Sequence, residues 1–510
     1  MSIELTSRSI GLAETYFDNF IEQGVDCDIT LPDYCPDIMR ILRCTVHNCI
    51  SNSKIIGDRA TADGNAKIRI VYADEKNKVF CYEQDYPFSK YAELSSAYDN
   101  AVLVCNAKTE YVNCRAVSKR RVDVHGVVSL HFTVKSGRQD TVISDACGDG
   151  IQLKKKGLDI DDVSSVVSKT FEVSQVENVG ETNSGIGKVL DASAAPILNE
   201  SKLIKGKILL KGELCVRVVY CADSGENETC TLCTNIPFNE IIEAASVTDE
   251  CRVDVKLFVN SLTAEPKTDN DGEYRYMNIN SELCALVTAY SKQSIKVITD
   301  AYSTDTDIDA KYRPVEFACV SHTFRDTLIC KDSLDVSSFS PQKLYAFTTS
   351  SPQTKCRFDG DKMIVSGKVP VSLVVIDAEG VPVLCEREAE FEYTRTLDGN
   401  ADYSCTPQFE LSGCSCNLMG DGKADFKAEI CISAVVFRTV REKVLTSLEA
   451  MEGTGRKQKK PALVIYFCQG NESVWDIARK YNTTVDEIMQ ENELSVDYLE
   501  NKTMLMIPVK

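Results

Sequence analysis

The chain has 510 residues, is 43% hydrophobic and carries a formal net charge of −19 at pH 7. The length predicts three or four domains at about 150 residues each, and the composition is that of a globular chain and not of a disordered one. The negative charge repels phosphate and anionic lipid, so we expect neither nucleic acid nor a membrane surface as a partner.

The first thirty residues mix acidic and polar side chains and lack the basic start and apolar run of a signal peptide. No stretch approaches the 18 apolar residues of a membrane span. We therefore expect the protein to act in the compartment where it is made. Its 23 cysteines are an odd number in a long chain, and many lie among strand residues, as in "ELCVRVVYC". This pattern favours reduced, half-buried thiols in a cytosol over a disulfide scaffold.

An internal repeat organises the chain. Residues 36–72 align without a gap with residues 184–220, and the match continues to "YPF" at 86–88 and "IPF" at 236–238. A third, weaker copy follows, in which the spacing of Gly64, Tyr72 and Phe88 recurs as Gly367, Val375 and Phe391. Self-similarity of this kind predicts three homologous units.

Each unit is predicted to consist of β-strands. The runs "AKIRIVY", "ELCVRVVY" and "KVPVSLVVI" are β-branched and partly alternating, as half-buried strands are. Asp-Gly pairs supply the positive φ of tight hairpins, at 63–64, 271–272, 359–360, 398–399 and 421–422. The predicted fold class is mainly β, with three tandem antiparallel β-sandwich-like modules followed by a small α+β domain.

The repeat and the composition set the expected domain limits. The three modules are expected at residues 27–140, 183–302 and 335–447, and the last domain at 463–510. The polar segments 141–182 and 303–334 contain strand-like patches, which predict connectors that dock on the modules. Residues 448–462 include the basic run "MEGTGRKQKKP", which has almost no apolar side chain and predicts a flexible linker.

Few sequence motifs in the modules indicate a metal-binding or catalytic site. Cys230 and Cys233 are the best metal candidates, but a second pair at zinc spacing is absent, so two thiols beside a hairpin are the favoured interpretation. The loop around Asp271 lacks the first ligand and the closing glutamate of a calcium loop. No Gly-x-Ser-x-Gly or His-Glu-x-x-His signature is present. We expect no cofactor, no metal and no catalytic residue, and hence a scaffold or binding protein.

The last domain has the clearest pattern. Ser473 with Asp476 and Thr484 with Glu487 form two capping boxes, each of which announces a short amphipathic helix. The strand-like runs "LVIYF" and "MLMIP" flank the two helices. The predicted order is strand, helix, helix, strand in fewer than fifty residues.

This order and the residues that fill it resemble the LysM domain. The residues that match the family pattern are Trp475, Ile477, Ala478, Tyr481, Thr484, Ile488, Asn492, Leu494, Ile507 and Pro508. The resemblance implies a groove that binds N-acetylglucosamine-containing glycans between the loop before the first helix and the loop after the second. The corresponding residues are Asn471, Glu472, Ser473, Val474, Asn492, Glu493, Leu494 and Ser495.

Two features of this copy favour a protein ligand over a glycan. The usual Gly-Asp-Ser/Thr turn is replaced by Asn471, Glu472 and Ser473, in which asparagine tolerates positive φ. Acidic residues also outnumber basic ones across 463–510. The chain's single tryptophan, Trp475, lies on the flank of the first helix, where we expect it to be buried against the flanking strand.

The three β units resemble the SPOCS domain of spore-forming Firmicutes, through "LPDYCPDIMRIL", "SKIIGDRATADGNAKIRIVYADE" and "YPF" in the first unit. Three such units followed by a LysM domain are similar to the spore-coat morphogenetic proteins of clostridia. That resemblance implies a protein of the mother-cell cytoplasm at the forespore surface or spore coat. It also implies that the LysM domain contacts the coat-basement ATPase, sporulation stage IV protein A, or other coat proteins.

Two other functions remain as hypotheses. The LysM domain could anchor the chain to peptidoglycan of the cortex or cell wall. An enzyme hidden in the β modules would require a concave pocket with convergent polar groups.

Overall fold

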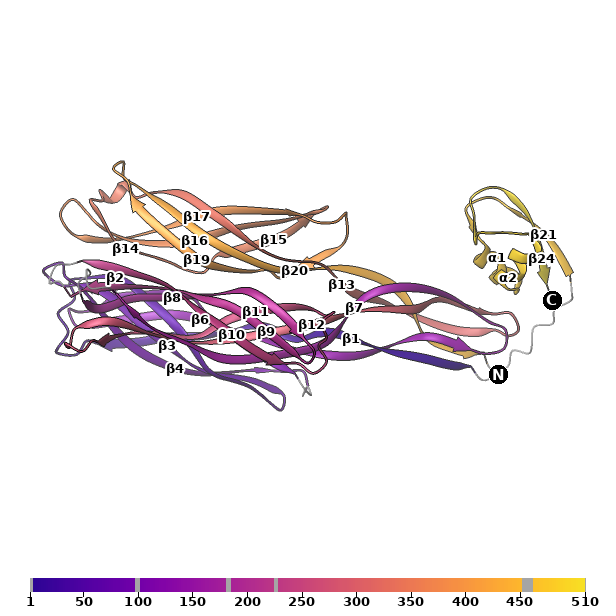
Figure 1. Cartoon of the computed structure of the whole chain (residues 1–510), viewed down its shortest axis with the longest axis horizontal. Coiled ribbons are helices and arrows are strands. Elements are labelled where there is room, and N and C mark those ends of the chain that lie inside the picture. The colour runs from indigo at the N-terminus through magenta and orange to yellow at the C-terminus, as the bar shows by residue number, and fades with distance from the viewer. Residues whose placement is uncertain (1–2, 97–100, 180–184, 224–227, 452–461, 510) are drawn as a thin grey trace.

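The computed structural model describes residues 3–96, 101–179, 185–223, 228–451 and 462–509. Figure 1 shows an elongated body of antiparallel strands, with a small module that contains two helices near the far end of its longest strands. The predicted fold class is confirmed, because three β-sandwich modules precede a small α+β module.

The three modules repeat one plan, in which two long strands enclose a small sheet and a shorter strand. The first contains β1 (Glu4–Thr30), β2 (Arg40–Ile56), β3 (Arg59–Ala73), β4 (Val79–Glu93), β5 (Val102–Ala116) and β6 (Arg121–Cys147). The second contains β7 (Ile151–Asn178), β8 (Ile186–Ile204), β9 (Lys207–Ala222), β10 (Thr229–Glu243), β11 (Arg252–Thr268) and β12 (Tyr274–Ser303).

The third module contains β13 (Ile308–Asp335), the short 3-10 helix η1 (Ser337–Phe339), β14 (Lys343–Thr349), β15 (Gln353–Asp359), β16 (Lys362–Ile376), β17 (Pro382–Thr396), β18 (Tyr403–Cys405), β19 (Gln408–Leu418) and β20 (Lys423–Ala450). The long strands pair as β1 with β6, β12 with β7, and β13 with β20. In each module the small sheet, β2 to β4, β8 to β10 or β14 to β17, packs on the sheet that contains the long strands.

A β-bulge interrupts the long-strand pairs at an equivalent place in every module. The unpaired residues are Ser144 on β6, Thr299 on β12 and Thr446 on β20. Each hydroxyl donates a hydrogen bond of 2.9 to 3.2 Å to a carbonyl oxygen of the paired strand. A bulge that recurs with the same chemistry is a designed feature of a strand. The repeat therefore extends into the long strands, beyond the segments in which the sequence reveals it.

A glycine opposite a phenylalanine marks the small sheet of each module. The cross-strand pairs are Gly64 with Phe88, Gly212 with Phe238, and Gly367 with Phe391. A Cβ atom on any of these glycines would overlap the facing phenylalanine ring. The ring fills the space that a side chain on the opposite strand would need. The third, weaker copy of the repeat shares this contact with the other two.

The Asp-Gly pairs were expected to mark hairpins, and three of the five do, at 271–272, 359–360 and 421–422, whereas 398–399 lies in a turn between β17 and β18, which belong to different sheets. Positive φ angles are found at Gly272, Gly360, Gly399 and Gly422. The hairpin predicted at residues 63–64 is wrong, because Gly64 lies within β3 and is paired on both sides. At this position the glycine leaves room for the Phe88 ring and does not form a turn.

The small sheets of the three modules meet in one shared core. Its members at equivalent bulged positions are Leu42, Leu190 and Tyr345, and its members at equivalent paired positions are Val71, Val219 and Val374. All six side chains are buried, with at most 8% of each exposed. The modules are therefore parts of one folded body, since each supplies the same share of a common core.

The long strands of all three modules share a second core. Its buried members are Ile10, Val142, Leu158, Ile160, Ile295, Val297, Val315, Phe317, Cys319 and Val444. A further cluster lies nearer the LysM-like module and includes Ile143 on β6, Ile298 on β12 and Leu445 on β20. These strands form the narrow extension of the body in Figure 1.

The two segments expected to be connectors are largely strands. Segment 141–182 holds the end of β6 and all of β7, and segment 303–334 holds the end of β12 and most of β13. Their polar composition has a physical cause, because residues of these strands alternate between the shared core and solvent. We propose that the module boundaries lie in the short turns at 148–150 and 304–307. Residues 452–461 of the expected linker lie outside the described residues, and 448–450 complete β20.

The second and third modules also meet at a buried polar contact. Gln408 at the start of β19 bonds both the N–H and the carbonyl of Leu257 on β11, and it thereby continues the hydrogen bonding of that strand. Glu410 is two residues further along β19. Desolvation raises the pKa of the Glu410 carboxyl to about 7. The hydrogen bond from Gln408 lowers this pKa, but its effect is smaller than that of desolvation.

We expect Glu410→Gln to stabilise the protein above pH 7. The folded chain keeps this carboxyl neutral up to a higher pH than the unfolded chain does, because the ordinary pKa of a glutamate carboxyl is 4.5. Stability is therefore lost as pH rises from about 4.5 to about 7, and the loss amounts to about 3 kcal/mol. Thermal unfolding at pH 8 should show a higher Tm for the variant. The two proteins should unfold alike at pH 4, and an equal difference at both pH values would contradict the assignment.

Candidate functional site

The terminal module has the expected order of elements. It contains β21 (Ala462–Cys468), β22 (Glu472–Ser473), α1 (Val474–Tyr481), α2 (Val485–Glu491), β23 (Tyr498–Leu499) and β24 (Thr503–Val509). Ser473 caps α1 by accepting a hydrogen bond from the N–H of Trp475, and the capping box of Thr484 and Glu487 is complete. Both predicted helix starts are confirmed.

The loop before the first helix, one of the two that were predicted to form a groove, pairs with residues 497–499, which follow the second predicted loop. Glu472 pairs with Leu499 and Ser473 with Tyr498, and the N–H of Val474 donates to the carbonyl of Asp497 at 2.8 Å. Asn471 has a φ of 57°, so asparagine does adopt the left-handed conformation of this turn.

Several of the predicted groove residues hold the module together. Both Glu472 oxygens are engaged, one by the Tyr466 hydroxyl at 2.7 Å and one by the Gln469 N–H at 3.0 Å. The Tyr466 hydrogen bond, with that of the Gln469 N–H, lowers the pKa of Glu472 below its ordinary value. The Asn492 side chain bonds both backbone groups of Met506 at 2.7 Å and so clamps α2 to β24.

Only part of the predicted set can therefore reach a ligand. Val474 is completely buried, and Leu494 packs against the module's core. Exposed side chains remain at Asn471, Glu493 and Ser495. With one carboxylate and no aromatic ring, these three provide little of the stacking surface on which sugars are commonly held.

Trp475 is buried, and it also contacts a distant part of the chain. Only 8% of its surface is exposed, and its ring meets that of Tyr302 on β12 edge to face, with centroids 4.9 Å apart. Its Nε1 donates a hydrogen bond of 2.8 Å to Oδ2 of Asp300. The indole nitrogen therefore binds Asp300 and not the flanking strand of the same module, which was the expected partner.

Asp300 is the centre of this contact, which we call the clasp and define as Asp300, Tyr302, Trp475 and Arg479. Arg479 lies 2.9 Å from the same carboxylate oxygen, and the Tyr302 hydroxyl donates to the carbonyl of Thr483 at 2.7 Å. Burial, with Asp300 adding to it, raises the pKa of the neighbouring Tyr312 hydroxyl to about 12. The clasp fixes the first helix of the module to the end of the long strands.

The outer face of the module's two-stranded sheet is apolar and exposed. We call this surface the sheet face, and its side chains are Leu463, Ile465, Phe467, Met504 and Met506, of which 37 to 64% is exposed. Ile465 pairs with Met506 and Phe467 with Met504, so the side chains adjoin one another. Sequence reasoning missed this face, although the alternation in "LVIYF" carries the signal, with Val464 and Tyr466 pointing to the core.

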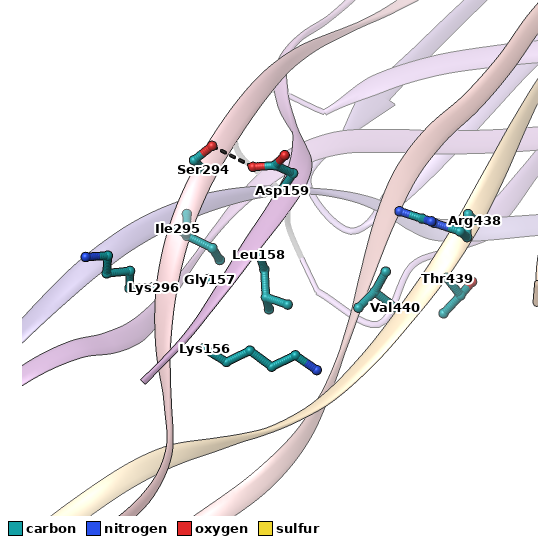
Figure 2. A pocket seen from close by; sticks show the side chains of 10 residues that line it. All are labelled: Lys156, Gly157, Leu158, Asp159, Ser294, Ile295, Lys296, Arg438, Thr439 and Val440. Carbon is teal, nitrogen blue, oxygen red and sulfur yellow. Dashed lines mark hydrogen bonds between the residues drawn. The ribbon is translucent and has the colours of Figure 1, made fainter. Parts of the chain in front are cut away.

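A cavity with a volume of about 640 Å³ lies between β7, β12 and β20 (Figure 2). It is lined by Lys156, Gly157, Leu158, Asp159, Ser294, Ile295, Lys296, Arg438, Thr439 and Val440. Figure 2 shows that its polar side chains point in different directions, and that Asp159 accepts a hydrogen bond from Ser294 at 2.6 Å. That bond and the nearby Lys292 keep the pKa of Asp159 low. A catalytic pocket requires polar groups that converge on one point, and the polar groups of this cavity do not.

The cysteine pair that was the best metal candidate lies on one strand. Cys230 and Cys233 are both on β10, where an odd spacing directs the two thiols to opposite faces. Within the described ranges, no group of three or more His, Cys, Asp or Glu side chains could hold a metal ion.

Comparisons with known proteins agree with the architecture. A family model described as "SipL, SPOCS domain" matches residues 37–117 and 185–267, and a LysM domain model matches residues 469–508. No curated protein and no solved structure matches the chain. Among the described residues, no helix is long and apolar enough to cross a membrane. The chain therefore carries SPOCS domains and a C-terminal LysM domain.

Proposed function

We propose that the protein is a non-enzymatic scaffold of spore-coat assembly, whose LysM domain binds another protein through the sheet face. SPOCS and LysM are families of non-catalytic binding domains, and their combination indicates a sporulation protein with a peptidoglycan-binding or protein-binding module. The partner is sporulation stage IV protein A or another coat protein. The site of action is the mother-cell cytoplasm, at the forespore surface or in the coat.

The sheet face is the observation that carries this proposal. Five adjoining apolar side chains stand exposed on a module whose predicted groove is partly occupied by its own hydrogen bonds. A contiguous apolar patch on a soluble protein marks an interaction surface, because burying each such side chain contributes about 1.5–3 kcal/mol. Acidic residues outnumber basic ones across 463–510, which favours a partner with a basic rim.

We expect the double variant Ile465→Asp and Phe467→Asp to lose its protein partner. A charge at each of the two central positions should weaken binding at least about 100-fold, because an unpaired carboxylate in a buried interface costs several kcal/mol. Co-purification of the full chain from sporulating cells, with identification of bound proteins by mass spectrometry, measures the loss. Asn471→Ala and Ser495→Ala in the predicted groove are the matched controls and should retain the partner.

Peptidoglycan binding is the alternative, and the same variants separate the two functions. Strong retention of the full chain on purified peptidoglycan, abolished by changing Asn471 and Leu494 and unaffected by the sheet-face changes, would overturn the protein-binding proposal. The emission of Trp475, held in the clasp, reports whether each variant keeps its fold.

A further inference from the structure

Two buried arginines occupy equivalent positions in the first two modules, and each contacts the next module along the chain. Arg69 on β3 aligns with Arg217 on β9 in the repeat, and only 8% and 9% of their surfaces are exposed. On the neighbouring strand Arg69 pairs with Glu83, whereas Arg217 pairs with Cys233. Residues directly opposite one another share a face of the sheet, so each arginine lies beside the side chain of its partner. The second pair therefore lacks the carboxylate of the first.

In the first module a carboxylate occupies one edge of the guanidinium. Nε of Arg69 donates a hydrogen bond of 2.7 Å to Oε1 of Glu83, and Nη2 lies 2.6 Å from the same oxygen. Nη1 lies 3.9 Å from Oδ1 of Asp191, which belongs to the second module. Nε and Nη2 form the edge of a guanidinium that matches a carboxylate in shape and charge. That edge of Arg69 is thus satisfied by the protein itself.

In the second module the same edge has no such acceptor. Nε and Nη2 of Arg217 are buried, and neither has a hydrogen-bond partner among the residues that the structure describes. The third-module residue at the place of Asp191 is Ala346, and the ring of the next residue, Phe347, lies over the guanidinium with its centroid 4.0 Å from Cζ. A ring over the face does not satisfy N–H groups that lie in the plane. Buried donors and a buried charge are unfavourable without a partner.

Cys233 leaves room for an acceptor at this edge. A cysteine side chain ends at its sulfur, whereas Glu83 continues past the corresponding atom to the carboxylate that contacts Arg69. The Cys233 side chain is exposed. A small anion can therefore approach from solvent past the Cys233 sulfur and reach Nε and Nη2 of Arg217.

We propose that Arg217 binds a small free carboxylate, such as formate, or bicarbonate at the place that the Glu83 carboxylate takes in the first module. The oxygens of the anion accept hydrogen bonds from Nε and Nη2, and its negative charge balances that of the buried guanidinium. Because Arg217 is only 9% exposed, the site suits a small anion better than a bulky one or a side chain of another protein. The bound anion lies where the second module meets the third, so it stabilises their contact.

The test follows the NMR line width of carbon-13-labelled formate in the presence of the full chain, at constant ionic strength. We expect the line to broaden, and unlabelled bicarbonate should reverse the broadening by displacing formate. Arg217→Met should abolish it, and so should Cys233→Glu, because the new side chain supplies the carboxylate that the first module has. Cys233→Ser is the matched control. It keeps the room and adds no charge, so it should bind formate as the wild type does.

Thermal unfolding gives a second readout. Formate at about ten times its Kd should raise the wild-type Tm by about 1 °C and leave that of Cys233→Glu unchanged. Without formate, Cys233→Glu should unfold at a higher temperature than the wild type.

Three results would overturn the inference. The first is a formate line that broadens no more with the wild type than with Arg217→Met, and the second is formate binding of wild-type affinity in Cys233→Glu. The third is benzoate that displaces formate as well as bicarbonate does, because a site of this size excludes its ring. Cys233→Glu keeps Arg217 in place, so its result is decisive even where Arg217→Met disturbs the fold.

Discussion

Replacing Asp300 by alanine should release the LysM domain from the body of the protein, and the single tryptophan should report it. The change removes the acceptor of the Trp475 Nε1 hydrogen bond and the partner of Arg479. A hydrogen bond to a charged group contributes about 1.5–3 kcal/mol, whereas the exposed Arg479 adds little. We expect Trp475 emission to shift to longer wavelength and acrylamide quenching to rise severalfold.

The comparison variants for this prediction come from β12 and β13, the two long strands joined by the turn at 304–307. Asp309→Ala removes an exposed carboxylate from β13 that lies 3.8 Å from Lys311, and it should leave the emission unchanged. Tyr302→Ala should act like Asp300→Ala, because it removes the ring and the hydroxyl on which Trp475 and Thr483 rest. Wild-type emission already typical of an exposed indole, or an equal response to Asp309→Ala, would refute the clasp.

Much of the fold could be predicted because local patterns and the repeat agree with each other. The alternation of the strands, the capping residues Ser473 and Thr484, and the matched Gly64 and Gly212 all indicate what the structure contains. The long strands were harder to recognise. A strand such as β7 packs one face on two other modules and exposes the other, so its composition resembles that of a polar connector.

The candidate site could be predicted only in part, for the same physical reason. The loops at 471–474 and 492–495 are close in sequence to the helices that position them, and the structure pairs the first of these loops with residues 497–499. The clasp depends on Asp300 and Tyr302, which are more than 170 residues away from Trp475. A pattern of neighbouring residues in the sequence cannot predict a contact between residues so far apart. The sheet face, in contrast, could have been predicted from the alternation of Leu463, Ile465 and Phe467.

The clasp and the sheet face lie on different parts of the LysM domain. Trp475 and Arg479 lie on the side of the LysM domain that faces the long strands, and Ile465 and Phe467 are exposed elsewhere on it. A module held at one side and free at another presents its apolar surface in a fixed direction. Pre-organisation of this kind reduces the entropy that a partner's binding must overcome.

The glycine beneath each phenylalanine should be the least replaceable residue of its module. In Gly212→Ala the new Cβ would overlap both the Phe238 ring and the Ile197 carbonyl oxygen. Neither can withdraw freely, because the ring is buried between strands and the carbonyl belongs to the β8 backbone. We expect a loss of about 3 kcal/mol in unfolding free energy, at the upper end of overpacking effects, measured by chemical denaturation followed by circular dichroism.

The equivalent changes test whether the three modules share this feature physically and not only in sequence. Gly64→Ala and Gly367→Ala should each destabilise by a similar amount, whereas Gly157→Ala on β7, where no atom lies within 4 Å of the new Cβ, should change little. Adding Phe238→Leu to Gly212→Ala should recover part of the loss, because the smaller side chain yields space that the ring occupies. Equal effects at Gly157 and Gly212 would mean that backbone flexibility, and not the ring, explains why glycine is found there. A loss of stability that occurs only at the three glycines that face a phenylalanine, and that Phe238→Leu reduces, would instead identify the glycine and phenylalanine pair as the contact that fixes strand spacing in all three small sheets.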